Sequence, residues 1–186
     1  VSSSVDGSRR ICSMWQQESG RAGPGALLRA IPWILLLWLM PFIAMATDIH
    51  WLWDDRCAEC HGHSAEFSRK FLRISENRLQ GRHDLRDLRL FLGNHYTPRN
   101  DVNAVYDMLL AQLKTPPRFR DECSACHNTA AAFIRASIVL HDGVLVGRAT
   151  NQPINEFMQS HRGLEPDDIE FFVKLLNRVA AEVNGE

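Results

Sequence analysis

Apolar residues recur at helical spacing near the C-terminal end of the chain. Five of them fall on one face when the segment is drawn as a helix: Ile169, Phe172, Val173, Leu176 and Val179. Pro166 precedes them and suits the first turn of a helix, where its missing N–H has no helical partner to lose. The pattern therefore predicts a helix from Pro166 to about Glu182, and apolar residues at the same spacing predict another from Val102 to Leu113.

A different pattern occupies residues 138–146. β-branched and other apolar residues flank Asp142-Gly143 there, which predicts a β-hairpin closed by a two-residue turn. Residues 71–79, centred on Glu76-Asn77, show a weaker version of the same pattern. We therefore expect a mainly helical protein with two short hairpins.

The chain contains a tandem repeat with an offset of 66 residues. Without a gap, 14 of the 57 positions from 57 to 113 are identical to their equivalents from 123 to 179, and the identities are spread over the whole unit. Internal self-similarity of this kind predicts two copies of one structural unit. The connector 114–118 separates the copies, and Pro116-Pro117 within it predicts that it is not helical.

Each repeat opens on the pattern Cys-x-x-Cys-His. Its members are Cys57, Cys60 and His61 in the first unit and Cys123, Cys126 and His127 in the second. This is the attachment motif of c-type haem, in which two thiols bind the porphyrin vinyl groups and the adjacent imidazole ligates the iron. A single Cys-x-x-Cys would also suit zinc or a dithiol redox centre, whereas two copies that both continue into His favour haem. We predict two covalent haems, each held on a short helix.

The repeat also indicates the second axial ligand of each iron, because a ligand that both haems need should recur at the equivalent position. His95 and His161 meet this condition, each 34 positions after the motif histidine. Both also lie at the end of an apolar stretch that we predict to be helical, and the spacing places the imidazole on the apolar face. We predict bis-histidine ligation. The alternative is that these two histidines are surface residues retained from the duplication.

The methionines do not recur in this way. Met108 aligns with Lys174, and Met158 aligns with Leu92. Met158 lies one helical turn before His161 and is the alternative distal ligand of the second haem, with core packing as its structural explanation.

An apolar segment precedes the first unit. Arg21 and Arg29 lead into residues 31–46, which end in the small-x-small cleavage pattern Ala44-Met45-Ala46. The segment is at the lower length limit for a bilayer span, so we predict a cleaved signal peptide, with an uncleaved anchor as the alternative. The expected organisation is an N-terminal extension and signal peptide (1–46), haem unit 1 (47–113), the connector (114–118) and haem unit 2 (119–186).

Composition narrows the range of partners. From residue 47 onward the chain carries 17 Lys and Arg against 20 Asp and Glu, with no basic run or stripe. Nucleic acid is therefore not an expected partner. The acidic balance is compatible with docking to a basic redox protein and equally with ordinary solubility.

The leader and the two motif-bearing units resemble the bacterial periplasmic di-haem c-type cytochromes, and the resemblance covers essentially the whole chain after the leader. It implies a periplasmic protein that transfers single electrons between redox partners, one of them membrane-bound, rather than an enzyme. The chain lacks the repeated distal Met of single-haem cytochromes c and is much shorter than the di-haem peroxidases. We expect a mainly α fold of two tandem cytochrome c-like units, each with a short β-hairpin between the haem-attachment helix and the distal-His helix.

Other repeated residues have weaker assignments. Arg82 and Arg148 are candidates for pairing with haem propionates, since a guanidinium matches a carboxylate bidentately, and a solvated strand end is the alternative. Arg69 and Arg135 share that possible role with less support. Six aromatic residues are expected to be packed, the phenylalanines as core and the tryptophans against the first haem: Phe67, Phe91, Phe133, Phe157, Trp51 and Trp53.

Two rival functions stay open: a gas sensor or small catalytic haem protein with an open axial site, and a structural zinc protein using the four motif cysteines. A haemochrome absorption measurement separates haem from zinc. We expect two covalent haems per chain in the purified protein, and a colourless zinc-containing protein would contradict the haem assignment.

Overall fold

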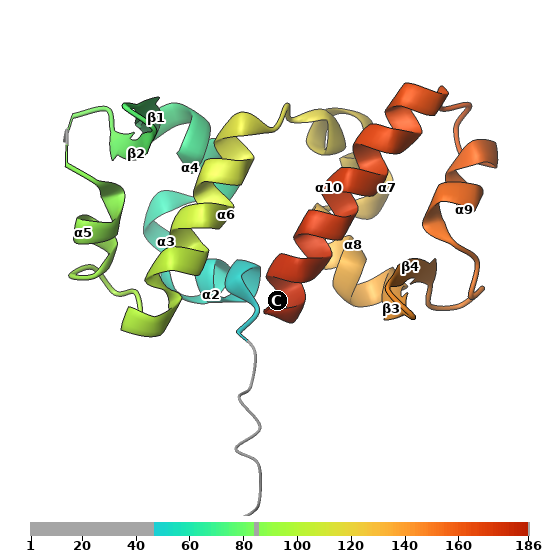
Figure 1. The fold of residues 1–186 in the computed structure, drawn as a ribbon, viewed down its shortest axis with the longest axis horizontal. Coiled ribbons are helices and arrows are strands. Elements are labelled where there is room, and N and C mark those ends of the chain that lie inside the picture. The colour runs from blue at the N-terminus through green and yellow to red at the C-terminus, as the bar shows by residue number, and fades with distance from the viewer. Residues whose placement is uncertain (1–46, 84–85, 186) are drawn as a thin grey trace, which may run out of the picture. The chain divides into compact units, whose positions relative to one another are not determined.

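The computed structural model describes residues 47–83 and 86–185, and the predicted leader lies outside them. Nine α-helices are described: α2 (Ile49–Arg56), α3 (Ala58–His61), α4 (Ser64–Phe71), α5 (Leu88–Leu92), α6 (Val102–Lys114), α7 (Ser124–His127), α8 (Ala130–Ser137), α9 (Ile154–Ser160) and α10 (Pro166–Asn184). Four strands form two separate hairpins: β1 (Leu72–Ser75) with β2 (Arg78–Gly81), and β3 (Ile138–His141) with β4 (Val144–Gly147). The expectation of a mainly α fold with two hairpins is confirmed (Figure 1).

The same order of elements occurs twice along the chain. A short helix ending in the motif histidine is followed by a second helix, a hairpin, a short helix and a long helix, first as α3 to α6 and then as α7 to α10. A 3₁₀ turn (Arg99–Asp101) precedes α6, and a π-helical turn (Phe119–Cys123) leads into α7. Both long helices have the predicted extent, within two residues at each end.

The hairpins have the same register in both units. Leu72 pairs with Gly81 and Ile138 with Gly147. The turn residues all have positive φ, Glu76 and Asn77 in one hairpin and Asp142 and Gly143 in the other, as a two-residue type I′ turn requires. The weaker Glu-Asn pattern of the first unit therefore forms the same turn as the stronger Asp-Gly pattern of the second.

Each unit has its own hydrophobic cluster, on either side of the connector. The first cluster gathers residues between Ile49 and Leu109, and the second gathers residues between Phe119 and Ala180. Tyr106 of α6 is buried in the first cluster, and its hydroxyl accepts a hydrogen bond of 2.7 Å from the backbone N–H of Leu79 in β2. This bond fixes the hairpin to the long helix.

Three local expectations need correction. Lys114, expected in the non-helical connector, is the last residue of α6. The short helices also end earlier than expected. His95 lies in a turn three residues after α5 and His161 is the C-cap of α9, so helical spacing alone does not set the direction of either imidazole. In both units the next residue, Tyr96 or Arg162, has positive φ, so the chain turns in the same way after each histidine.

Side chains from both units meet through α2. The Arg135 guanidinium in α8 donates to both carboxylate oxygens of Asp48 at 2.6 and 3.0 Å, while one of these oxygens also accepts from the Trp51 N–H at the start of α2. His50 contacts Glu182 of α10 at 2.7 Å. A repeated arginine, Arg135, is therefore used here in a charge-assisted contact between the units.

None of the helices in the described ranges is long and apolar enough to cross a membrane.

Asp48 provides a test of the contact between the units. Asp48→Ala removes both the helix cap and the ion pair and should lower the free energy of unfolding by about 1–2 kcal/mol. Asp48→Asn can still cap α2 and should lose about half as much, because only the charge pairing is removed.

The same variants test the pH dependence. Burial alone would raise the pKa of Asp48, but hydrogen bonds from Arg135 and the Trp51 amide hold it below its ordinary value of 3.8. Because the folded pKa is the lower one, the stabilisation is present above pH 3.8 and is lost as the pH falls through the folded pKa. In denaturant titrations the difference between wild type and Asp48→Asn should persist at pH 7 and shrink as the pH falls below 3.8. A difference independent of pH would contradict this account.

Candidate functional site

The two cysteine pairs have the same local geometry. Cys57 is the N-cap of α3 and Cys123 is the N-cap of α7, both with φ −120°. The second cysteine lies three positions later, one helical turn on, so the spacing brings the two thiols of each motif to one side. Each one-turn helix thus presents two thiols and an imidazole together.

The thiols are free and partly open to solvent. No disulfide joins the four cysteines in the part of the chain that the structure describes. Cys60 and Cys126 are exposed, while Cys57 and Cys123 are half-buried, and burial raises the pKa of these two thiols. Each unit therefore presents one thiol to the solvent and one at its half-buried edge.

Each motif histidine faces the candidate distal histidine of its own unit. The ring centres of His61 and His95 are 5.9 Å apart, and those of His127 and His161 are 6.0 Å apart. Two imidazoles that bind one metal from opposite sides need a similar separation, about 6 Å, from two metal–nitrogen bonds of about 2 Å and about 1 Å from each nitrogen to its ring centre. The separation suits two axial ligands of one metal in each unit. It is nearly the same in both units.

The environment favours the uncharged form of the motif histidines. Burial, together with the facing imidazole, lowers the pKa of His61, and the same two causes lower the pKa of His127. A neutral imidazole is the form that ligates a metal. Among the described residues, no group of three or more His, Cys, Asp or Glu side chains converges as a metal site, so the close imidazoles occur as pairs.

Repeated aromatic rings pack against both histidines of each pair, and only Phe157 and His161 are stacked face to face. Phe67 lies 4.9 Å from His61 and Phe133 lies 4.5 Å from His127, measured between ring centres. On the distal side, Phe91 lies 4.4 Å from His95 and Phe157 lies 4.9 Å from His161. Each imidazole therefore has an aromatic neighbour that restricts its orientation.

The expected core position of the phenylalanines is only half right. Phe67 and Phe133 pack against the two hydrophobic clusters, but Phe91 and Phe157 are 46% and 37% exposed. The buried face of α5 is formed by Leu88 and Leu92, four residues apart, and leaves Phe91 outside it.

The two tryptophans also differ. Trp53 is buried, and its indole N–H donates at 2.9 Å to the carbonyl of Gly62, the residue that follows the motif histidine His61. Trp51 is 58% exposed, so the described protein residues do not cover it, and its packing against the first haem stays a prediction. Both lie on α2, where residues two apart point to different faces, whereas strand-like alternation would have put them on one side.

Met158, the alternative distal ligand, lies in the hydrophobic cluster of the second unit and is 9% exposed. His161, not Met158, is the residue whose ring faces His127.

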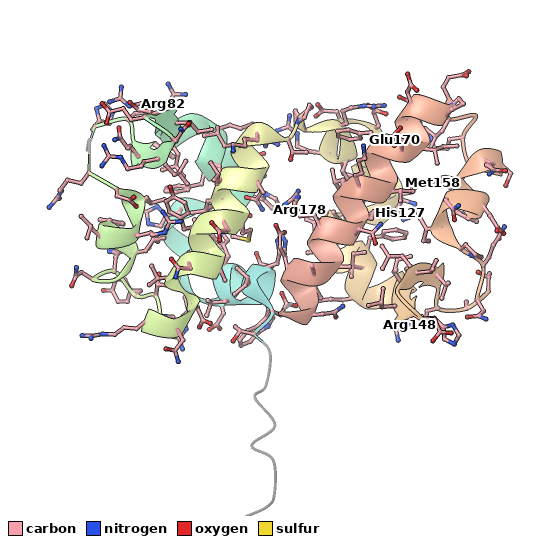
Figure 2. The ribbon with its side chains drawn as sticks, viewed as in Figure 1. Arg82, His127, Arg148, Met158, Glu170 and Arg178 are labelled. Atoms are coloured by element: carbon pink, nitrogen blue, oxygen red, sulfur yellow. The ribbon has the colours of Figure 1, made fainter. Side chains whose placement is uncertain are left out.

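Arg82 and Arg148 lie beside the two hairpins (Figure 2). Their guanidinium groups donate to the carbonyls of Arg69 and Arg135, the equivalent residues near the ends of α4 and α8, at 3.0 and 3.1 Å. Arg148 also donates to the Ile138 carbonyl. The shared contact is therefore to helix-end carbonyls, which are left without helical partners. Propionate pairing stays a prediction.

Arg69 and Arg135 are not used alike. Arg69 donates to the carbonyls of Ala65 and Thr115, whereas Arg135 pairs with Asp48. The sequence repeat alone does not reveal this difference, because the partner Asp48 precedes the first unit's motif and has no equivalent counterpart in the alignment.

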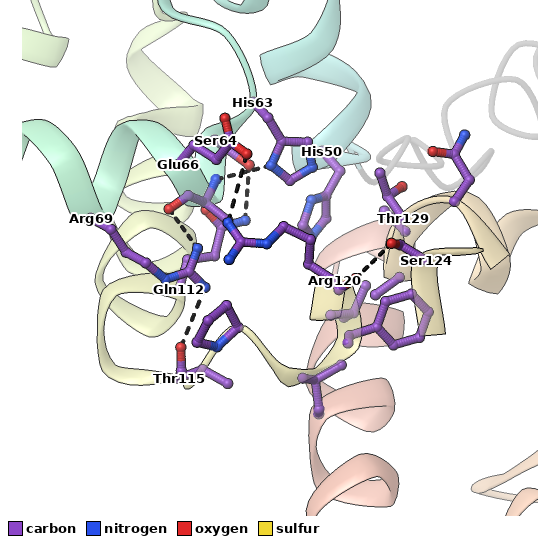
Figure 3. Close-up of a pocket in the computed structure, with 18 of the residues that line it drawn as sticks. His50, His63, Ser64, Glu66, Arg69, Gln112, Thr115, Arg120, Ser124 and Thr129 are labelled. Carbon is purple, nitrogen blue, oxygen red and sulfur yellow. Dashed lines mark hydrogen bonds and ion pairs between the residues drawn. The ribbon is translucent and has the colours of Figure 1, made fainter. Parts of the chain in front are cut away.

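A cavity that sequence patterns did not indicate lies between the two units. It has a volume of about 320 Å³, and Figure 3 shows side chains from both units around it, including His63, Arg69, Gln112 and Arg120. Gln112 donates to the Ser64 hydroxyl, and its own side-chain carbonyl oxygen is buried without a protein partner. The candidate ligand histidines do not line this cavity.

No known protein family, curated protein or solved structure matches this chain.

The arginine contacts lead to a prediction that distinguishes two roles. Arg148→Ala should lower the free energy of unfolding by about 1 kcal/mol, because two backbone carbonyls lose their donor, and Arg82→Ala should lower it by a similar or smaller amount. A stability loss without a change in redox potential would support the structural role. A shift in the potential of one haem, without loss of stability, would support propionate pairing instead.

Proposed function

We propose that the protein is a di-haem c-type cytochrome that carries single electrons between redox partners. The observation that carries the proposal is the occurrence, in both units, of two free thiols and an imidazole on one short helix with a second imidazole facing it at about 6 Å. Two copies of this arrangement at equivalent positions are hard to explain as accidents of packing.

The residues have separate roles in this proposal. Cys57 and Cys60 attach the first porphyrin, and Cys123 and Cys126 attach the second. His61 with His95, and His127 with His161, supply the axial nitrogen ligands. When bound, each haem iron supplies reversible one-electron chemistry between the ferric and ferrous states.

The second imidazole favours a carrier over a sensor or catalyst. A protein that binds a gas or substrate at iron needs an open or weakly held axial position, whereas each unit here holds two half-buried imidazoles opposite one another. Imidazole also stabilises ferric iron more than a thioether does, so both potentials should be lower than with a Met ligand.

The compartment and partners belong to the same proposal. Covalent haem attachment and the apolar segment at 31–46 both support export to the periplasm. The partners would be a donor and an acceptor protein, one of them at the membrane.

Replacing the distal histidines tests the function directly. His95→Ala and His161→Ala should each convert one of the two haems from low-spin to high-spin, because one axial position becomes open. EPR and optical spectra of the purified holoprotein measure the spin state, and an optical redox titration measures the two potentials.

His83→Ala and His141→Ala are matched controls, since both side chains are exposed and face no motif histidine. They should leave both haems low-spin. Low-spin spectra in both distal variants would refute the ligand assignment. Rapid and complete binding of carbon monoxide to the reduced wild-type protein would instead favour the sensor or catalyst.

A further inference from the structure

The cavity between the two units borders both haem-attachment motifs. His63, which lines it from the first unit, follows the motif histidine His61 by two positions. Asn128, which lines it from the second unit, directly follows His127. Consecutive Cα atoms are about 3.8 Å apart, so these lining residues lie within about 7.6 Å and about 3.8 Å of the motif histidines, measured between Cα atoms. A molecule in the cavity would therefore lie near the proximal ligand of both candidate haems.

The two units contribute different kinds of side chain to this cavity. The first unit supplies mainly polar groups from α2, α4 and α6, among them His50, Arg69 and Gln112 (Figure 3). The second unit adds an apolar set: Phe119, Ala130, Ala131, Leu175 and Val179. A lining of apolar surface with a few polar groups is typical of small-molecule sites, and a volume of about 320 Å³ suits a compact ligand.

The charges around the cavity balance. Three arginines line it, and three carboxylates offset them, two in the lining and a third on Glu182, which pairs with Arg178 at 2.6 Å. An ion that entered would add an unpaired charge in partly buried surroundings, and that is costly. The lining therefore favours a neutral ligand.

Two hydrogen-bond acceptors of the first unit lack a donor. Gln112 is 7% exposed, and its side-chain carbonyl oxygen is buried without a partner, although its amide donates to Ser64. The Asp54 carboxylate also lines the cavity and forms no hydrogen bond or ion pair within the described ranges. A buried acceptor without a donor costs about 1–3 kcal/mol. Hydroxyl groups on a ligand would supply the missing donors.

We propose that this cavity binds a small hydroquinone, which delivers one electron to each haem. The proposal rests on the proposed function and adds the chemical class of an electron donor. A hydroquinone is neutral, has a flat apolar ring and carries two hydroxyl donors, so it matches the size, charge and hydrogen-bonding needs of the lining. It also releases two electrons, and the cavity borders two one-electron centres.

The reaction is balanced without a further reactant. Two O–H bonds of the hydroquinone break, and its two C–O bonds become the C=O bonds of a quinone. One electron reduces the ferric iron of the first unit, the other reduces the ferric iron of the second, and two protons go to water.

Binding is tested apart from electron transfer with resorcinol, an isomer of hydroquinone that cannot form a quinone by losing two electrons. Calorimetry on the ferric holoprotein should show one site per chain. Gln112→Leu removes the amide at similar volume, and Ala130→Phe fills the cavity, so each should weaken binding about tenfold. The matched control is Ala136→Phe, the same change at an exposed position of α8 outside the cavity, and it should alter binding less than about twofold.

Electron delivery is tested with menadiol, a methylated naphthohydroquinone, in an anaerobic stopped-flow instrument. The rate of haem reduction should saturate with menadiol concentration, and one menadiol should reduce both haems of a chain. At low menadiol the rate should fall about tenfold in Ala130→Phe, as binding does, and stay unchanged in Ala136→Phe. Reduction by dithionite should be the same in all variants. Vesicles that carry the same head group on an isoprenoid tail, used in place of free menadiol, distinguish a membrane-held donor from a soluble one by which reduces the haems faster.

Several outcomes would overturn the proposal. Absence of resorcinol binding, or equal losses in Ala130→Phe and Ala136→Phe, would show that the cavity holds water only. A rate that stays proportional to menadiol concentration and is the same in every variant would show that electrons enter elsewhere. In each case, two low-spin haems that dithionite reduces normally would leave the proposed function intact, whereas absence of haem would remove both proposals.

Discussion

The separation of about 6 Å between two imidazoles in each unit is the constraint on which the rest of the structure depends. The chain runs 34 residues from the motif histidine before it returns to face it, so the intervening elements must hold the second ring in place. The hairpin reverses the direction of the chain within this stretch. In the first unit, the hydrogen bond from the Leu79 N–H to the Tyr106 hydroxyl attaches the hairpin to the long helix. Leu88 and Leu92 then fix α5 to the core, and the turn that follows aims His95.

The two small units have separate hydrophobic cores and polar contacts with each other. Each has its own hydrophobic cluster, and a porphyrin between the facing imidazoles would add apolar surface that the protein alone does not supply. The contacts between the units are polar and specific, with Asp48 and Arg135 as the partly buried pair. Pairs of this kind need good geometry because both charges lose water, and the bidentate bond together with the helix cap provides it.

The two units differ most at exposed positions, where the fold does not restrain the side chain. The rings that contact the histidines are the same in both, whereas the neighbouring exposed positions differ in size and charge. In the proposed carrier, different surfaces beside equivalent histidine pairs would suit different partners for the two units.

The sequence by itself determined the two long helices, the short motif and distal-histidine helices, both hairpins and the equivalent positions, because helical periodicity, Asp-Gly-type turns and a gapless repeat are local or internal signals. It did not predict α2, α4 or α8. It also pointed to the thiols and to both facing histidines. Only the tertiary structure decided that Phe91 packs against His95 outside the core, that Trp51 is exposed, that Arg82 and Arg148 bind helix-end carbonyls, and that Arg135 pairs with Asp48. These features depend on where helices end and on which distant groups come into contact. The spacing of residues along the sequence contains no information on either.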